Sequence, residues 1–145
     1  MFDENALAIT LLWPHAEPHR DVMKRYAIFS GVIAGALVKL GIDARVGELL
    51  DEYCPGKFSI NAAGRVKLVG IAQRMNSRCV QMGAVIAVER SETACVAIAE
   101  AYCAMGLPFN PKTYGATTEF LPPQSYRDLS SFIIKSVVSQ FNAQS

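Results

Sequence analysis

The chain has 145 residues and a formal net charge of +1, from 14 basic and 13 acidic side chains. This length predicts one domain with a core of its own, and 51% hydrophobic residues with a mean hydropathy of +0.21 exclude a disordered chain. The near-neutral charge argues against a nucleic-acid partner, because such a protein normally has a clearly basic surface.

The sequence leads us to expect neither a membrane span nor a secretory signal. No apolar run reaches the roughly 18 residues that a membrane-spanning helix needs. Asp3 and Glu4 make the start acidic, whereas a secretory signal begins with positive charge. We therefore expect a cytoplasmic protein. Its four cysteines have the spacing of neither a metal-binding knuckle nor a disulfide scaffold, so no metal site is expected.

The hydrophobic pattern predicts five strands, one of them short, and three helices. In chain order, the strands are expected at residues 6–13, 42–46, 57–61 (the short one, within a loop), 65–74 and 80–88, and the helices at residues 20–40, 91–105 and 125–141. Residues 75–78 should form the turn of a hairpin, and residues 107–123, which are rich in proline, should be irregular. This order predicts the α+β class, with a mixed or antiparallel β-sheet flanked by helices.

Each predicted helix has an apolar stripe. The expected inward residues are Met23, Tyr26, Ala27, Ser30, Ile33, Ala34, Leu37 and Leu40 in the first helix, Cys95, Ile98, Ala99, Tyr102 and Met105 in the second, and Leu129, Phe132, Ile133, Val137 and Phe141 in the third. Gly31 and Gly35, four residues apart, predict a close approach of the first helix to another element.

Cys54 lies in a Pro-Gly turn, within the segment EYCPGKFSIN. Lys57, Arg65 and Lys67 follow within thirteen residues, and nearby cations favour the nucleophilic thiolate. No histidine stands near enough in the sequence to act as its base, so the residues alone leave a reactive and an unreactive thiol open. Cys79, Cys95 and Cys103 are expected to be inert, the last two as small hydrophobic side chains on one helix face.

Lys67 lies in the predicted strand 65–74 between two apolar residues. Its ammonium group must either face water or bind something polar in a cleft. Gly64 and Gly70 stand three residues before and after it, and glycine in a strand often marks the close approach of a ligand or another backbone. Both positions for Lys67 stay open on this pattern.

EYCPGKFSIN followed by GRVKLVGIAQR resembles the lipoate-protein ligase and octanoyltransferase family, and most closely its cysteine-bearing lipoyl or octanoyl amidotransferase branch. The resemblance implies a biotin/lipoate ligase-like catalytic domain. It implies that Cys54 takes an acyl group as a thioester and that Lys67 binds the acyl carbonyl or an acyl-adenylate phosphate. Ser59, Gly64, Gly70 and Gln73 would line the acyl slot or its loop.

The resemblance covers only the C-terminal part of the family domain. Full-length relatives carry an arginine-containing, glycine-rich motif before the strand that matches residues 6–13, so we expect a domain lacking its N-terminal portion. Residues 1–145 are expected to form a single partial domain, with residues 107–145 as a C-terminal loop and helix extension. A separate chain, self-association or a truncated product would each account for the unpartnered first strand.

Three functions are compatible with this resemblance. The first is an acyltransferase that moves an octanoyl or lipoyl group to a lysine of a lipoyl-carrier domain, with a glycine-cleavage H-like, E2-like or acyl carrier protein as partner. The second is a lipoate-protein ligase that uses ATP and Mg²⁺, with Cys54 as a bystander. The third is a non-catalytic fragment or a subunit of a split enzyme. The sequence predicts no covalently bound cofactor.

Overall fold

The computed structural model describes residues 3–14, 17–123 and 125–142. Its strands are β1 (Ala6–Pro14), β2 (Ala44–Val46), β3 (Ile60–Ala62), β4 (Val66–Met75) and β5 (Cys79–Ala87). Its helices are α1 (Val22–Lys39), α2 (Glu92–Met105) and α3 (Tyr126–Asn142), with short 3-10 helices η1 (Pro111–Thr113) and η2 (Thr117–Phe120). The predicted α+β class is confirmed.

The five strands form one sheet in the order β1-β5-β4-β3-β2, and every neighbouring pair is antiparallel. The predicted hairpin joins β4 to β5, where the Asn76 side-chain oxygen accepts hydrogen bonds from the backbone of Arg78 and Cys79. The strand expected at residues 57–61 begins only at Ile60, because the residues before it belong to a loop folded over the start of β4.

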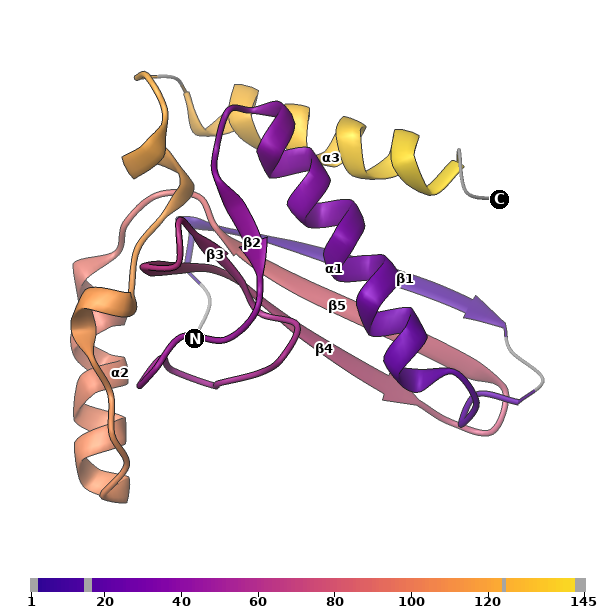
Figure 1. Ribbon diagram of the computed structural model, residues 1–145, viewed down its shortest axis with the longest axis horizontal. Coiled ribbons are helices and arrows are strands. Elements are labelled where there is room, and N and C mark those ends of the chain that lie inside the picture. The colour runs from indigo at the N-terminus through magenta and orange to yellow at the C-terminus, as the bar shows by residue number, and fades with distance from the viewer. Residues whose placement is uncertain (1–2, 15–16, 124, 143–145) are drawn as a thin grey trace.

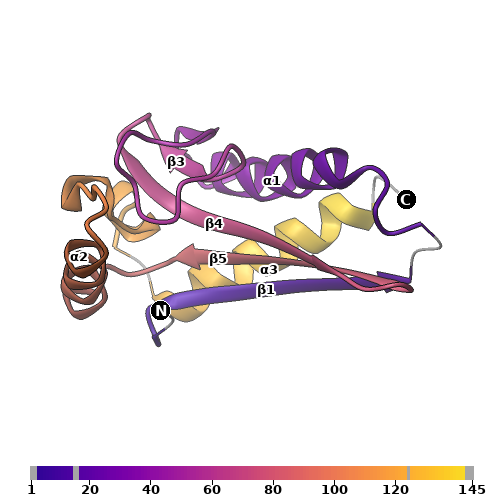
Figure 2. The same ribbon diagram turned by 90° about the horizontal axis from the view of Figure 1, so that it is seen from below.

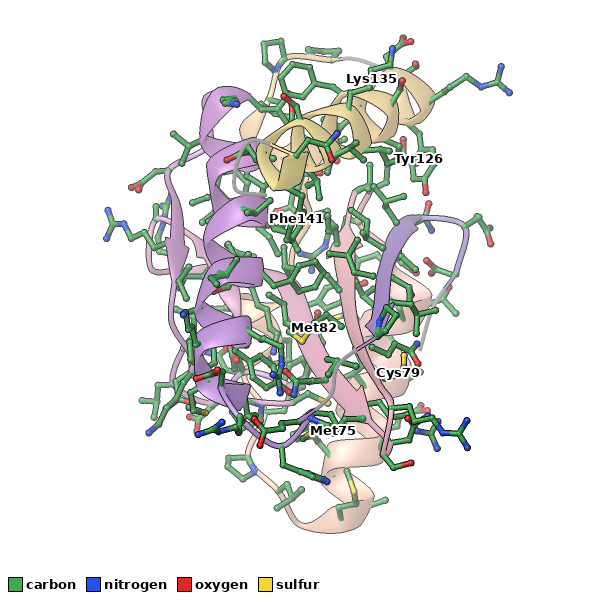
Figure 3. The ribbon with its side chains drawn as sticks, turned by 90° about the vertical axis from the view of Figure 1, so that its right-hand side faces the viewer. Met75, Cys79, Met82, Tyr126, Lys135 and Phe141 are labelled. Atoms are coloured by element: carbon green, nitrogen blue, oxygen red, sulfur yellow. The ribbon has the colours of Figure 1, made fainter. Side chains whose placement is uncertain are left out.

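Helices α1 and α3 pack on the same face of the sheet (Figures 1 and 2). The buried residues of β5 alternate along the strand and point toward these helices. Phe29 of α1 and Phe141 of α3 are in ring contact at 5.9 Å, and Figure 3 shows Met82 and Phe141 within this apolar layer. None of the described helices is long and apolar enough to cross a membrane.

The opposite face of β1, β5 and β4 carries mostly small side chains. Ala8, Val85 and Gly70 lie side by side across the three strands, and Thr10, Gly83 and Ala72 form the next row. Of the described helices, α1 and α3 cover the other face, and α2 stands at one end of the molecule (Figure 2). We call these two rows the small-residue face. Ala8, Thr10 and Ala72 are exposed on it.

The buried side of α1 differs from its predicted stripe. Met23 is 56% exposed and Ala27 is also exposed, whereas Phe29, Val32 and Ala36 are buried. The reason is that α1 contacts both the sheet and α3, so its buried surface is wider than one stripe and rotated from it.

Two other predicted inward residues are also exposed. Met105 ends α2, which projects away from the sheet, and is 57% exposed; Phe132 of α3 is 40% exposed. The predictions for these two residues were wrong because each helix is covered over less of its surface than its apolar stripe suggests.

The two glycines of α1 differ in their surroundings. A Cβ atom at Gly31 would meet nothing within 4 Å, whereas one at Gly35 would lie 2.8 Å from the side-chain oxygen of Gln140 in α3. The predicted close approach therefore exists at Gly35 and is absent at Gly31.

This difference predicts the stability of two variants. Gly31→Ala should raise the free energy of unfolding by about 0.5 to 1 kcal/mol, because alanine is the better helix former and its methyl group enters open space. Gly35→Ala should gain less, since its methyl group displaces Gln140. Urea unfolding of both variants tests this, and equal gains would contradict the described contact between α1 and α3.

Candidate functional site

A bulge in β4 determines where Lys67 lies. Asn61 of β3 pairs with Lys67 but Ile60 pairs with Val69, so Leu68 is an extra residue in β4. Leu68 and Val69 are both buried in the core, while Lys67 lies beside Gly70 of the small-residue face. The side chain of Lys67 is only 1% exposed, so of the two sequence-based alternatives the water-facing one is wrong.

The Lys67 ammonium group is fully hydrogen-bonded. Its Nζ lies 3.0 Å from Glu52 Oε1, 2.8 Å from the carbonyl oxygen of Tyr53 and 2.7 Å from the carbonyl oxygen of Cys54. A lysine ammonium has three hydrogens to donate, and each has an acceptor here. The cation therefore holds the backbone of the loop that carries Cys54.

Glu52 supplies the counter-charge, although no local pattern in the sequence marks it as a site residue. Its carboxylate is buried, with Oε1 also accepting from the Ser59 hydroxyl at 2.8 Å and Oε2 accepting from the Leu49 backbone N–H at 3.1 Å. Burying two charges is costly unless each is paired and hydrogen-bonded, as both are here. Glu52 and Lys67 thus stabilise each other, and Glu52 also ties Leu49, before the Cys54 turn, to Ser59, after it.

Both polar backbone atoms of Cys54 are hydrogen-bonded, and its side chain is exposed. The carbonyl accepts from Lys67, and the N–H donates to the hydroxyl oxygen of Tyr102 in α2 at 2.5 Å. The residue has a φ of +42°, in the left-handed region that only a few residue types adopt without strain. These contacts hold the residue in that conformation with its thiol available to solvent.

An aromatic cluster joins this loop to α2. Tyr53 contacts Phe109 and Tyr114, and Phe109 in turn contacts Tyr102, with ring centroids 5.5 to 6.4 Å apart. Lys67 Nζ lies 4.8 Å from the centre of the Tyr53 ring, within range of a cation–π interaction. Burial, followed by the nearby Tyr114 and Glu52, raises the pKa of the Tyr53 hydroxyl above its ordinary value, so Tyr53 stays neutral near pH 7.

Of the four residues expected to line the substrate slot, Ser59 and Gly70 lie near Lys67. Ser59 joins it through Glu52, and Gly70 lies so close that a Cβ there would be 3.9 Å from Lys67 Cε. Gly64 lies in the β3–β4 turn with a φ of +70°, and its N–H donates to the Asn61 side chain.

Gln73 lies apart from this group. It is six residues beyond Lys67 in β4, which corresponds to about 20 Å of strand. Its side-chain oxygen accepts from Arg25 Nε at 3.2 Å, and its N–H donates to the Tyr26 hydroxyl. The structure therefore does not bring Gln73 together with Cys54 and Lys67.

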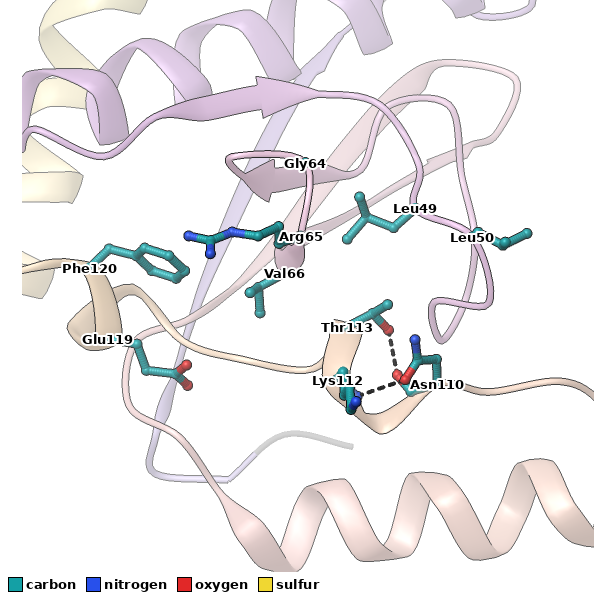
Figure 4. Close-up of a pocket in the computed structure, with 10 residues that line it drawn as sticks. All are labelled: Leu49, Leu50, Gly64, Arg65, Val66, Asn110, Lys112, Thr113, Glu119 and Phe120. Carbon is teal, nitrogen blue, oxygen red and sulfur yellow. Dashed lines mark hydrogen bonds between the residues drawn. The ribbon is translucent and has the colours of Figure 1, made fainter.

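A depression of about 610 Å³ lies beside the site, between the β3–β4 turn and η1 and η2 (Figure 4). Gly64, Arg65 and Val66 line one side, and Asn110 holds η1 on the other by bonding the Lys112 backbone and the Thr113 hydroxyl. Neither Cys54 nor Lys67 lines it, so we place the candidate reaction centre at the loop instead.

The remaining cysteines differ in exposure. Cys95 is buried in the small core under α2, as expected, and Cys79 is half-buried. Cys103 is exposed, so the prediction that it packs as a buried thiol was wrong. The cause is the same as for Met105, because the end of α2 projects into solvent (Figure 1).

No protein-family profile matches the chain. Two curated relatives match it over 74 residues, and both are named octanoyl-[GcvH]:protein N-octanoyltransferase. The protein from Anoxybacillus flavithermus is 31% identical and that from Geobacillus kaustophilus 28% identical, over 51% of this chain and 26% of each relative. The match therefore covers about a quarter of the relatives' length.

Solved structures match nearly the whole chain. A lipoate protein ligase from T. acidophilum with bound lipoic acid has a TM-score of 0.70 at 20% identity, covering 97% of this chain and 53% of its own. A bi-partite lipoate protein ligase from Thermoplasma acidophilum, solved in a study that includes its E2 lipoyl domain, gives 0.69 at 14% identity and 52% coverage. Biotin protein ligase from Aquifex aeolicus gives 0.61 at 12% identity and 54% coverage.

The comparisons confirm the resemblance found in the sequence. The chain has the fold of part of a lipoate- and biotin-ligase catalytic domain, and it spans about half the length of these solved structures. In sequence it matches octanoyltransferases over half of its own length.

The buried ion pair predicts a large effect of removing one partner. Lys67→Met should lower the free energy of unfolding by about 3 to 5 kcal/mol, because it leaves the Glu52 carboxylate buried without a counter-charge. Combining it with Glu52→Gln should recover part of this loss, since glutamine is neutral and still accepts hydrogen bonds. Urea unfolding of the single and double variants measures these free energies. A loss in the double variant equal to the sum of the two single losses would contradict the pairing.

Cysteine exposure predicts an order of alkylation. Burial raises the pKa of the Cys95 thiol, so at pH 8 a smaller fraction of it is the reactive thiolate, and iodoacetamide must also reach a buried atom. Peptide mapping of the folded protein should show Cys103 modified well before Cys95, and both modified alike in urea. Equal rates in the folded protein would place Cys95 at the surface.

Proposed function

We propose that this chain provides the acyl-capturing centre of an acyltransferase that moves an octanoyl or lipoyl group to a lysine of a lipoyl-carrier domain. One observation carries the proposal. Cys54 is exposed, and its backbone carbonyl oxygen lies 2.7 Å from the buried Lys67 ammonium group. A potential nucleophile and a fixed cation are thus parts of one hydrogen-bonded unit, as acyl transfer requires.

The reaction has two balanced steps. In the first, the Cys54 sulfur bonds to the acyl carbonyl carbon, the bond from that carbon to the donor's leaving group breaks, and the leaving group takes the thiol proton. In the second, the amine of the acceptor lysine attacks the thioester, the carbon–sulfur bond breaks, and the thiol regains a proton from the amine. Splitting the transfer in this way replaces one difficult step by two easier ones.

Lys67 would stabilise the negative charge that develops on the acyl oxygen. All three of its hydrogens are used in the structure, two of them on the carbonyls of Tyr53 and Cys54. The acyl oxygen would therefore take the place of one of these carbonyls. Glu52 and Ser59 would keep the ammonium group in position during this exchange.

The small-residue face would accept the acyl chain. It begins at Gly70, next to the Lys67 side chain, and continues through Ala72 and Gly83, none of which obstructs a methylene chain. In this arrangement Gly70 would contact the acyl group, and Gly64 would shape the turn beside the loop. Gln73 lies at the far end of β4 and on the face that carries α1, so it would not contact the acyl chain.

The partners would be lipoyl-carrier or acyl-carrier proteins. The curated relatives are named for transfer from octanoyl-GcvH to a protein, which supports an H-like donor and a lipoyl-domain acceptor. β1 pairs with β5 alone among the described strands, and none of the described helices covers the small-residue face. We propose that the part of the ligase domain without a counterpart in this sequence covers that face, whether it belongs to the same polypeptide or to another one.

Intact-mass spectrometry tests the chemistry. The protein incubated with octanoyl-loaded acyl carrier protein should gain the mass of one octanoyl group, and hydroxylamine should remove it, because it cleaves thioesters. Cys54→Ser should abolish the gain, whereas Cys103→Ser, which also removes an exposed thiol, should retain it. A gain that survives Cys54→Ser would contradict the proposed nucleophile.

Other outcomes identify the alternatives. Transfer to a lipoyl domain that needs ATP and Mg²⁺ and survives Cys54→Ala would favour a lipoate-protein ligase. An adduct that forms only after addition of a protein with the glycine-rich segment would indicate a split enzyme. No adduct and no transfer under either condition would favour a non-catalytic binding subunit.

A further inference from the structure

Tyr102 contacts the Cys54 loop from a distant part of the chain. Its hydroxyl oxygen accepts the Cys54 backbone N–H at 2.5 Å, although the two residues are 48 positions apart. A tyrosine hydroxyl can also donate one hydrogen bond. Within the described parts of the chain, no acceptor for that proton is found. The proton is therefore available to a ligand at Cys54.

The bond to the Cys54 N–H limits how far this hydroxyl can lie from the cysteine sulfur. The bond geometry of a cysteine keeps its sulfur within about 4 Å of its own backbone nitrogen, so the Tyr102 oxygen, 2.5 Å from that nitrogen, lies at most about 6.5 Å from the sulfur. Contact with Phe109, at 5.5 Å between ring centres, holds the tyrosine ring. Accepting the N–H bond also polarises the hydroxyl and makes it a better donor.

Two side chains bond Cys54 in the described part of the chain, Tyr102 and Lys67, and of these two only Tyr102 has a proton without an acceptor. The Cys54 N–H is used by Tyr102, and the three hydrogens of Lys67 are used by Glu52 and the two loop carbonyls. Lys67 can bind an acyl oxygen only by giving up an existing bond. Tyr102 can do so without breaking any.

We propose that the Tyr102 hydroxyl donates a hydrogen bond to the acyl carbonyl oxygen while the Cys54 sulfur attacks the acyl carbon. This role rests on the proposed function for its biological setting. The carbon–sulfur bond to Cys54 forms, the bond to the donor's leaving group breaks, and the leaving group takes the thiol proton. Tyr102 keeps its proton throughout and stabilises the negative charge that the oxygen carries between the two events.

The test compares acylation with alkylation at the same sulfur. The octanoyl thioester of N-acetylcysteamine reacts through a charged oxygen, whereas iodoacetamide reacts with a thiolate without forming one. Peptide mapping gives both rates at Cys54 and, in the same sample, at the exposed Cys103 as an internal reference. Tyr102→Phe removes only the hydroxyl, and Tyr126→Phe is a matched control, since the Tyr126 hydroxyl bonds the Ala6 carbonyl in β1.

Tyr102→Phe should lower acylation of Cys54 by about tenfold or more, as loss of an oxyanion-stabilising donor does, and should change alkylation of Cys54 far less, because alkylation feels only the loss of the bond to the Cys54 N–H. Tyr126→Phe should change neither rate. An unchanged acylation rate in Tyr102→Phe would overturn the proposal, and so would an equal fall of both rates, which would show that the hydroxyl only shapes the loop. Because the probe is a small thioester, a failure of transfer between carrier proteins would refute the proposed function and leave this result standing.

Discussion

The Lys67 ammonium group is a buried cation whose hydrogens all point to oxygen atoms of residues 52–54. A buried charge is tolerated only when such partners are present, so β4 can keep this lysine only if the loop folds over it. The loop in turn has no regular secondary structure of its own to hold it. Strand and loop therefore depend on each other, and the exposed position of Cys54 follows from that dependence.

The rest of the fold places this pair at the end of an open surface. Helices α1 and α3 bury one face of the sheet, so large apolar residues collect on that side. The bulge at Leu68 keeps the core continuous through Leu68 and Val69 while Lys67 lies beside Gly70 of the small-residue face. At the same end, α2 reaches the loop through Tyr102 and the aromatic cluster. Strand β4 and helix α2 thus both bond Cys54, through Lys67 and Tyr102.

Local patterns in the sequence predicted the elements and two residues of the site. Cys54 stands in a Pro-Gly turn and Lys67 in a strand flanked by glycines. In both cases the residues that mark the position lie within three residues of it, so a local pattern is enough to find it. Glu52 was not predicted, because a glutamate in a loop ordinarily faces water and nothing local shows that it is buried. Tyr102 was expected to point inward, but its contact with Cys54 depends on how α2 is placed relative to a loop 48 residues away. Gln73 belongs to the same sequence motif as Lys67, and yet an extended strand carries it to the other end of the sheet.

The most direct test of this account is the exchange of lysine ammonium hydrogens with water, measured by ¹⁵N-resolved NMR. The other five lysines are exposed, so their ammonium hydrogens should exchange quickly. We expect one ammonium signal that exchanges far more slowly than the rest and that disappears in Lys67→Met. Six ammonium groups that all exchange at a similar fast rate would mean that Lys67 does not bind the loop carbonyls, and the described basis for the position of Cys54 would be wrong.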